Sequence, residues 1–404
     1  MSRHKYIQPY YIFFLILPAG ISNGFVTVVL PYFLTKNGIS VAITASIVAI
    51  AISANVWRFL WGPIVDISLS LKKWFWIGIS SSIVTLLLLC FIPLRADGVI
   101  LLSVIVFISQ VAATISLLPV NGFMANCIDE NKKGKASGWY QAGSLTGTGL
   151  GGGAGLWIAT HYSIQTAGII LCLASFLFAL FIFLFNDIKH NKEITIISEI
   201  KNMASEILAM IKIPVSLFVV FLVMMPIGSG AMSNLWSAIA QDWKADVSTV
   251  VLVTGILSGL ISALGCVAGG FVADKWGVWV AYLGSGTLCA IVAFIIALLP
   301  LYPMVYIGGV LAYAFSTGLV YAAFTSLTLY AIGKKHVATK FSLIASLGNL
   351  PVAYVTSLNG WVHDKFNSRY MLLTEAVLGM AFVIVFCFIL KRMMNKKLIP
   401  TVVE

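Results

Sequence analysis

The sequence predicts an all-α membrane protein with twelve transmembrane helices in two pseudo-symmetric six-helix bundles. Three observations support this prediction: an apolar composition, a series of apolar runs, and motifs that recur in each half. Of the 404 residues, 60% are hydrophobic and 10% are charged, whereas soluble domains carry about 25% charged residues. This small number of charges cannot cover a water-soluble surface. The composition therefore excludes a soluble enzyme and a disordered chain.

The apolar runs are long enough for helices across the hydrocarbon core, which needs about 20 residues. We expect twelve spans, at roughly residues 10–35, 41–65, 74–94, 99–127, 134–160, 164–186, 214–241, 246–272, 277–299, 303–331, 338–361 and 369–391. Because further runs follow the first, we interpret that run as a span and not as a cleaved signal peptide.

Lysine and arginine residues are distributed unevenly between the predicted loops. Nineteen of the 25 lie at the N-terminus, in even-numbered loops or in the C-terminal tail, five lie in odd-numbered loops, and Arg58 lies inside a span. This positive-inside bias predicts a multi-pass protein of the cytoplasmic (inner) membrane with both termini cytoplasmic. The net charge of +11 therefore reflects the membrane topology, and we expect anionic lipid to be the partner of these positive residues. We expect no nucleic-acid partner.

Groups for catalysis or metal binding are missing from the sequence pattern. The six cysteines form no CxxC pair, and the five histidines show no metal-ligand spacing. No GxSxG, HExxH or Walker sequence occurs. We therefore expect a protein that is not an enzyme and that holds no metal and no cofactor.

Motifs repeat between the two halves at a nearly constant offset. Pro18-Ala19-Gly20 recurs 208 residues later as Pro226-Ile227-Gly228, and Gly62 and Asp66 recur at the same offset as Gly270 and Asp274. Such an internal repeat predicts two six-span domains, at 1–186 and 214–404. Between them, polar residues and helically spaced isoleucines predict a cytoplasmic linker at 187–213, with either an amphipathic helix on the membrane face or a plain linker.

A six-plus-six chain with Gly-xxx-Asp after spans two and eight resembles the major facilitator superfamily over essentially its whole length. The second copy, Gly270–Gly277 (GFVADKWG), matches that family's loop motif, whereas the first copy lacks a basic residue directly after Asp66. A narrower stretch, Arg58–Asp66 (RFLWGPIVD), is similar to the muropeptide permease and acetyl-CoA transporter branch. That branch would imply a proton-linked importer of a bulky, polar, often anionic solute.

Arg58 is the leading candidate for a solute contact. A charge in hydrocarbon costs about 2.5–3.5 kcal/mol even on lenient scales, and an arginine fork can grip a carboxylate or phosphate with two hydrogen bonds. The alternative is a structural role at the contact between spans two and eleven. In the resembled fold spans one, four, seven and ten line the path. We therefore add to the expected substrate-binding set Asn23, Asn121, Asn234, Tyr313 and Tyr321, with Asn349 of span eleven.

The carboxylates suggest gating and coupling roles. Asp66 and Asp274 end even-numbered spans and are expected to face the N-termini of spans eleven and five, which attract negative charge, with Lys275 beside the second as a gating residue. Glu375, inside span twelve, is the candidate for proton coupling, with a structural role as its alternative. The Pro-x-Gly motifs predict broken helices in spans one and seven, which would point to a midplane site.

The function that fits these features is secondary active transport of a polar, anionic organic solute by alternating access. The resemblance to the proton-linked branch implies symport with protons. The residues themselves leave the coupling ion open. We expect the partners to be a small-molecule solute, protons and the lipid bilayer, and the protein to be a monomer. The alternative function is a transporter-like sensor or scaffold in the membrane that moves nothing.

Overall fold

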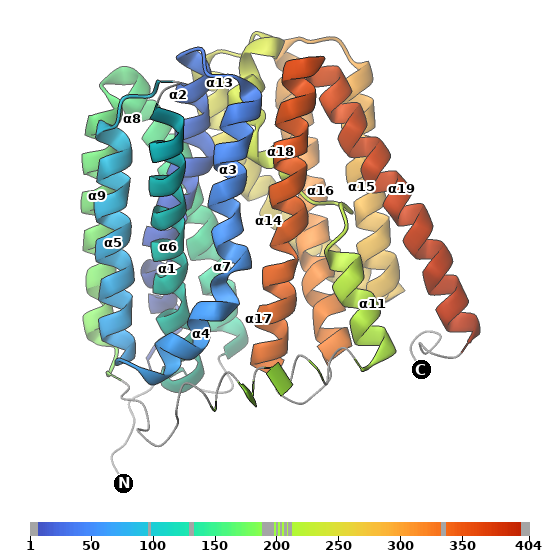
Figure 1. Cartoon of the computed structure of the whole chain (residues 1–404), viewed down its shortest axis with the longest axis horizontal. Coiled ribbons are helices and arrows are strands. Elements are labelled where there is room, and N and C mark those ends of the chain that lie inside the picture. The colour runs from blue at the N-terminus through green and yellow to red at the C-terminus, as the bar shows by residue number, and fades with distance from the viewer. Residues whose placement is uncertain are drawn as a thin grey trace. The chain divides into compact units, whose positions relative to one another are not determined.

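The structure is a computed structural model of the chain, and it describes residues 7–95, 98–128, 133–187, 198, 201–202, 204–205, 208, 212–332 and 337–396. All regular secondary structure in these residues is helical (Figure 1). The all-α prediction is therefore confirmed for this part of the chain. The helix predicted within 187–213 falls mostly outside the described residues and stays a prediction.

Within the described residues, nine helices are long and apolar enough to cross a membrane. They are Tyr11–Lys36, Leu71–Phe91, Val99–Met124, Ile164–Leu184, Val247–Ala273, Val278–Leu298, Pro303–Ala331, Lys340–Lys365 and Ser368–Asn395. Two shorter apolar helices, α3 (Val41–Val56) and α11 (Pro214–Val223), lie within the predicted spans 41–65 and 214–241. The chain is therefore a multi-pass membrane protein, and the count of twelve spans stays a prediction.

The chain divides into two compact units. Unit 1 comprises Met1–Ile39 with Ile50–Glu199, and unit 2 comprises Ser40–Ala49 with Ile200–Glu404. The first turns of α3 thus belong to unit 2, where both carboxylate oxygens of Asp364 accept hydrogen bonds from the backbone N–H groups of Val41 and Ala42, at 3.0 and 2.9 Å. The domain boundaries at 186 and 214 stay predictions.

Unit 1 is built on a contact between helix backbones. The helix α1 (Tyr11–Gly24) packs against α7 (Lys133–Gly149) and the π-helical turn Leu150–Ala154. A Cβ added to Gly20 would lie 2.6 Å from the carbonyl oxygen of Ser144, and one added to Gly147 would lie 2.5 Å from that of Leu17. Because only hydrogen fits at these positions, the glycines set the distance between the two helices.

An apolar core fills the space beside this contact. It is formed by α5 (Leu71–Phe91), α6 (Val99–Cys127) and α9 (Ile164–Ala179) together with α1. Ile12, Phe75, Val120, Phe123 and Phe185 are each at most 1% exposed there. After the π-helical turn Phe25–Val29, the first span continues as α2 (Leu30–Lys36), and the fifth span continues as α8 (Gly155–His161).

The predicted helix break in the first span is wrong. Pro18 and Gly20 both lie inside α1, which runs without interruption from Tyr11 to Gly24. The close contact of Gly20 with α7 keeps this stretch helical, because an unwound segment could not fit against the neighbouring backbone. The second span is instead interrupted where no break was expected: α3 ends at Val56, and α4 (Arg58–Ile67) begins after Trp57.

Unit 2 contains the remaining helices. These are α11 (Pro214–Val223), α12 (Trp236–Ile239), α13 (Val247–Val250), α14 (Ser258–Trp276), α15 (Val278–Leu298), α16 (Pro303–Ile332), α17 (Val337–Leu347), α18 (Asn349–Lys365) and α19 (Ser368–Asn395). In Figure 1, α19 runs beside α15 and meets α18 at one end. The π-helical turn Val251–Leu257 joins α13 to α14.

The predicted break in the seventh span is confirmed. α11 stops at Val223, and an irregular segment follows in which Gly228 and Gly230 have φ angles of +58° and +72°. Only glycine adopts such angles without strain, and Pro226 has no N–H to continue the helix. Residues 224–230 and the 3₁₀ turn Ala231–Asn234 together form the broken segment of unit 2.

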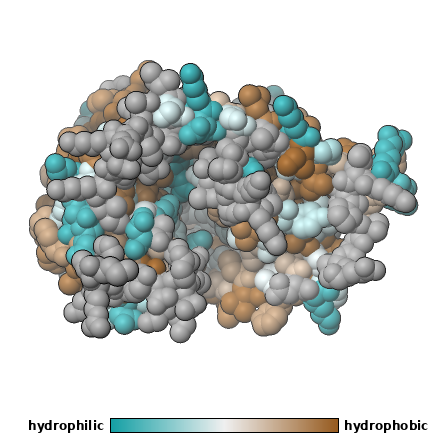
Figure 2. All heavy atoms as spheres, turned by 90° about the horizontal axis from the view of Figure 1, so that it is seen from below, coloured by the Kyte–Doolittle hydropathy of each residue, from teal (hydrophilic) through white to brown (hydrophobic). Residues whose placement is uncertain are grey.

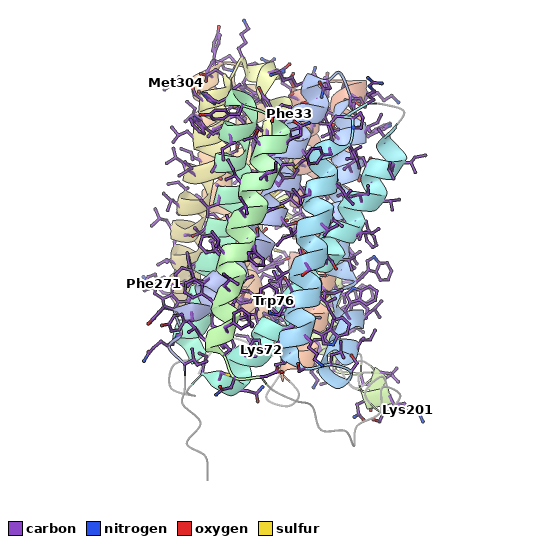
Figure 3. The ribbon with its side chains drawn as sticks, turned by 90° about the vertical axis from the view of Figure 1, so that its left-hand side faces the viewer. Phe33, Lys72, Trp76, Lys201, Phe271 and Met304 are labelled. Carbon is purple, nitrogen blue, oxygen red and sulfur yellow. The ribbon has the colours of Figure 1, made fainter. Side chains whose placement is uncertain are left out.

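The surfaces of the helices suit a lipid environment. Phe271 and Met304, on α14 and α16, are 72% and 76% exposed. Figure 2, seen from below, shows hydrophilic residues at the helix ends beside brown apolar residues. In Figure 3, Phe33 and Lys72 lie at opposite ends of the unit 1 helices, as expected for consecutive loops on opposite sides of a membrane.

Candidate functional site

Arg58 begins α4 and is half-buried in unit 1. Its Nε atom is buried and has no hydrogen-bond partner among the described residues. The guanidinium lies close enough to Tyr140 of α7 for its charge to act on that phenol. At least one donor of the arginine fork is therefore available to an acceptor that the described residues do not supply.

Trp61 adds a second free donor on the same helix. Its indole Nε1 is also buried without a hydrogen-bond partner among the described residues. Residues three apart lie on the same face of a helix, so α4 presents two buried donors one turn apart. Sequence reasoning quoted Trp61 within the RFLWGPIVD stretch but assigned it no role. An acceptor-rich group would satisfy both donors, and burying polar groups without such a partner is costly.

The other candidates of unit 1 differ in burial. Asn23 in α1 is half-buried and Asn121 in α6 is exposed. A buried polar network that sequence reasoning missed links the same two helices: Gln110 Nε2 donates to Ser22 Oγ at 3.1 Å, and Ser109 Oγ lies 3.4 Å from Ser22 Oγ. These side-chain contacts link α1 to α6.

The predicted gating residues are only partly described. Asp66 and Asp274 lie on α4 and α14, and their side chains fall outside the described part of the structure. Lys275 is exposed, with its Nζ 5.7 Å from the ring centroid of Trp276. The gating roles of all three residues therefore stay predictions.

In unit 2, four chain segments meet at the carboxylate of Glu375. This residue lies two turns into α19 and is 6% exposed. Tyr313 of α16 donates its hydroxyl to Oε1, and Asn359 of α18 donates Nδ2 to Oε2 at 2.5 Å. The backbone N–H of Met232 in the broken segment adds a third donor. Glu375 and Tyr313, predicted for separate roles, are thus neighbours.

A small cavity adjoins this carboxylate. Its volume is about 10 Å³, and it is lined by Glu375, Cys289, Ser229, Gly228 and Gly379, among others. A space of this size is about that of one water molecule. Gly228 and Ser229 of the broken segment line it together with residues of α15 and α19.

The other predicted contacts of unit 2 are dispersed. Asn234 is half-buried, and its Nδ2 lies 3.4 Å from Thr356 Oγ1. Asn349 donates Nδ2 to the carbonyl of Ala345 in the preceding turn, and Tyr321 is 55% exposed. Asn234 belongs to the broken segment and lies beside α18, and the Tyr321 hydroxyl also lies near this segment, 3.7 Å from a Cβ added to Gly230.

A second polar cluster lies at one end of α18. His363 Nε2 lies 2.7 Å from Asp242 Oδ2, and Ser368 donates to the same oxygen. Burial favours the neutral form of Asp242, but these hydrogen bonds outweigh it and hold the pKa of Asp242 below its usual value. Within the described residues, no group of three His, Cys, Asp or Glu side chains could hold a metal ion.

A protein-family comparison matches most of the chain. The family model described as Major Facilitator Superfamily matches residues 12–356. Among curated relatives, Multidrug resistance protein MdtG of Salmonella arizonae is 28% identical over 190 residues. That alignment covers 46% of this chain and 45% of the relative, so the chain matches about half of the relative's length.

Solved structures of similar fold span nearly the whole chain. A D-xylose-proton symporter has a TM-score of 0.72 at 14% identity, covering 93% of this chain and 97% of that chain. The nucleoside transporter NupG has a TM-score of 0.72 at 13% identity, covering 95% and 98%. The peptide transporter POT in complex with sulfate has a TM-score of 0.73 at 11% identity, covering 95% and 94%. At these identities the likeness establishes a shared fold.

Proposed function

Because the chain belongs to the major facilitator superfamily, whose model matches residues 12–356, we propose that it is a secondary transporter that moves a polar organic anion by alternating access. The family consists of membrane transporters and not of enzymes. Transport of small molecules is also what the names of the similar solved structures describe.

The observation that supports an anionic solute is the pair of free donors on α4. Arg58 Nε and Trp61 Nε1 are buried without hydrogen-bond partners in the described residues. An arginine carries a permanent charge, and a carboxylate or phosphate would pair with that charge and accept from both donors. In this proposal Asn23 and Asn121 add uncharged polar contacts in unit 1. Asn234, Asn349, Tyr313 and Tyr321 stay proposed solute contacts of unit 2.

The proposal is tested in two stages. A thermal-shift screen of acetyl-CoA, muropeptides, siderophores and simple anions identifies compounds that stabilise the detergent-solubilised protein. A labelled form of the best compound is then used for counterflow in proteoliposomes, which requires no driving ion. Accumulation above the equilibrium level supports a transporter. Binding without any counterflow would instead support the alternative, a sensor or scaffold.

The topology proposed for this function places both termini in the cytoplasm and the protein in the cytoplasmic (inner) membrane as a monomer. Single cysteines at Lys133 and Arg95, in a background without native cysteines, test it with a membrane-impermeant thiol reagent. The reagent added outside should label position 95 and leave position 133 unlabelled. The reverse pattern would refute the topology.

Asp66, Asp274 and Lys275 form the proposed cytoplasmic gate. Neutralising either carboxylate removes its attraction for a helix N-terminus, which carries about half a positive charge. Asp66→Asn and Asp274→Asn should therefore increase the accessibility of inner-side cysteines to thiol reagents. Wild-type counterflow combined with unchanged accessibility in both variants would show that these residues do not gate.

A further inference from the structure

The buried carboxylate of Glu375 has no cationic partner among the described residues. The titratable groups that face it are Tyr313 from α16 and Cys289 from α15. From α18 the facing group is Asn359, which is neutral at every pH, and the broken segment contributes the backbone of Met232. A buried charge without a counter-ion is costly and is commonly avoided by protonation, so this site is suited to exchange a proton.

The second observation is the unpaired oxygen of Asn359. This residue is 0% exposed, and its Oδ1 has no hydrogen-bond partner within the described residues. Ionised carboxylates accept only, whereas a carboxylic acid must donate its O–H. The three donors around Glu375 therefore satisfy the ionised form. The Asn359 amide could satisfy the neutral form as well, because its free oxygen is an acceptor on the same group.

The cavity provides a place for the molecule that delivers the proton. It adjoins Glu375 on the side of Gly228, Ser229 and Gly379, and its volume of about 10 Å³ matches one water molecule. Polar atoms line it, since both the carboxylate and Ser229 contribute. A single water molecule there could transfer a proton to the carboxylate and accept the proton when it is released.

We propose that Glu375 binds and releases a proton, and that its protonation state sets the orientation of the Asn359 side-chain amide. On uptake, a hydronium ion at the cavity transfers its proton to Oε2 and becomes water. The hydrogen bond from Asn359 Nδ2 to Oε2 breaks, the amide turns by half a rotation, and the new O–H donates to Asn359 Oδ1. Tyr313 and Met232 keep their bonds to the carboxyl group, and release reverses every step.

This inference deepens the proposed function, because a proton site in unit 2 would supply the coupling ion for a transporter. The amide rotation would also link the proton to the packing of α18 on α19. Proton binding itself needs no solute and can be measured on the full chain alone. Its failure can therefore be distinguished from a failure of the transport proposal.

Infrared difference spectroscopy of the full chain in liposomes, recorded without solute as pH is lowered, tests the proton site. The wild type should gain a carboxylic-acid C=O band that Glu375→Gln lacks. Glutamine has nearly the same shape as the acid, so this variant should fold. Identical spectra of the wild type and Glu375→Gln would overturn the proposal. So would a pH-insensitive wild type that is stabilised by sodium chloride but not by choline chloride, since it would indicate a sodium site.

The role of Asn359 is tested with a matched variant on the same helix. Asn359→Leu removes a donor to the charged form and an acceptor from the neutral form, and the bond to the charged form is the stronger. The half-titration of the Glu375 band should therefore move to higher pH by about one unit. Asn349→Leu, which loses a bond to Ala345 of α17 and none to the Glu375 cluster, should leave it unchanged. Equal effects of the two variants would refute the amide rotation.

Filling the cavity tests the route of the proton. A Cβ on Gly379 would lie 3.5 Å from both Ala290 Cβ and the carbonyl oxygen of Pro226, which is ordinary contact, so Gly379→Ala should fold. The band should then appear more slowly after a pH jump than in the wild type. Gly284→Ala, where a Cβ meets nothing within 4 Å, is the control. Equal rates in all three proteins would overturn the proposed route through the cavity.

Discussion

The two Pro-x-Gly motifs, 208 residues apart in the sequence, have different structures in the two units. Pro18 and Gly20 lie inside the continuous helix α1, whereas Pro226 and Gly228 lie where α11 has ended. The neighbouring positions explain the difference. Position 230 is a glycine with φ of +72°, and its counterpart in unit 1 is Ser22, a helical residue that accepts a hydrogen bond from Gln110.

The comparison shows how one repeated motif can support two kinds of site. In unit 1 the helix stays intact and packs tightly against α7, and the buried donors without a partner in the described residues include those of Arg58 and Trp61 on α4. In unit 2 the helix opens, and its freed backbone N–H at Met232 reaches the carboxylate of Glu375. We infer that unit 1 provides the anion contact and unit 2 provides the proton site.

The largest effect expected on stability comes from the helix contact of unit 1. A Cβ at Gly151 would overlap the carbonyl oxygen of Ile21. Gly151→Ala should therefore force the helices apart and destabilise the protein by about 1–3 kcal/mol, seen as a lower melting temperature in detergent. Gly259→Ala has open space around it and should be neutral or slightly stabilising. Equal melting temperatures for the two variants would contradict this packing.

A smaller effect is expected at the broken segment. Gly230→Ala places a side chain on a left-handed backbone, which costs about 1–2 kcal/mol, although the new Cβ would meet Thr317 Cγ2 at an ordinary 3.4 Å. The equivalent Ser22→Ala keeps a helical residue and loses the acceptor for Gln110 and the contact with Ser109. The melting temperature should fall in Gly230→Ala. The half-titration pH of the Glu375 infrared band should also change in Gly230→Ala and stay unchanged in Ser22→Ala. The opposite pattern would remove the distinction between the two motifs.

The sequence predicted the helical membrane class and most of the long spans, because these depend on composition and local periodicity. It did not predict that α1 stays intact, since that depends on Gly20 meeting a helix more than a hundred residues later. Nor did it predict the meeting of Tyr313, Asn359 and Glu375, which come from three different helices. Free donors such as Trp61 Nε1 are recognisable only when the surrounding acceptors are known.

The smallest effect is expected at Asp242 and depends on pH. Its pKa is held below the usual value by hydrogen bonds from His363 and Ser368, despite burial. A lowered pKa means that this contribution to stability is present above the pKa of the unfolded chain and is lost as pH falls through the folded value. The melting temperatures of wild type and Asp242→Asn should therefore differ at neutral pH and converge below about pH 4. If the two melting temperatures still differ in acid, the negative charge of Asp242 is not the cause of the difference.

The central claim, that unit 1 binds an anion through Arg58, is tested most directly by affinity for the anion found in the thermal-shift screen. A charge-assisted contact contributes about 1.5–3 kcal/mol, so Arg58→Ala should weaken binding ~10–150-fold. Arg58→Lys should be intermediate, and Trp61→Phe, which loses one neutral donor, should weaken binding roughly 2–10-fold. If Arg58→Ala instead lowers stability while the folded fraction keeps wild-type affinity, Arg58 is a structural residue and the claim is wrong.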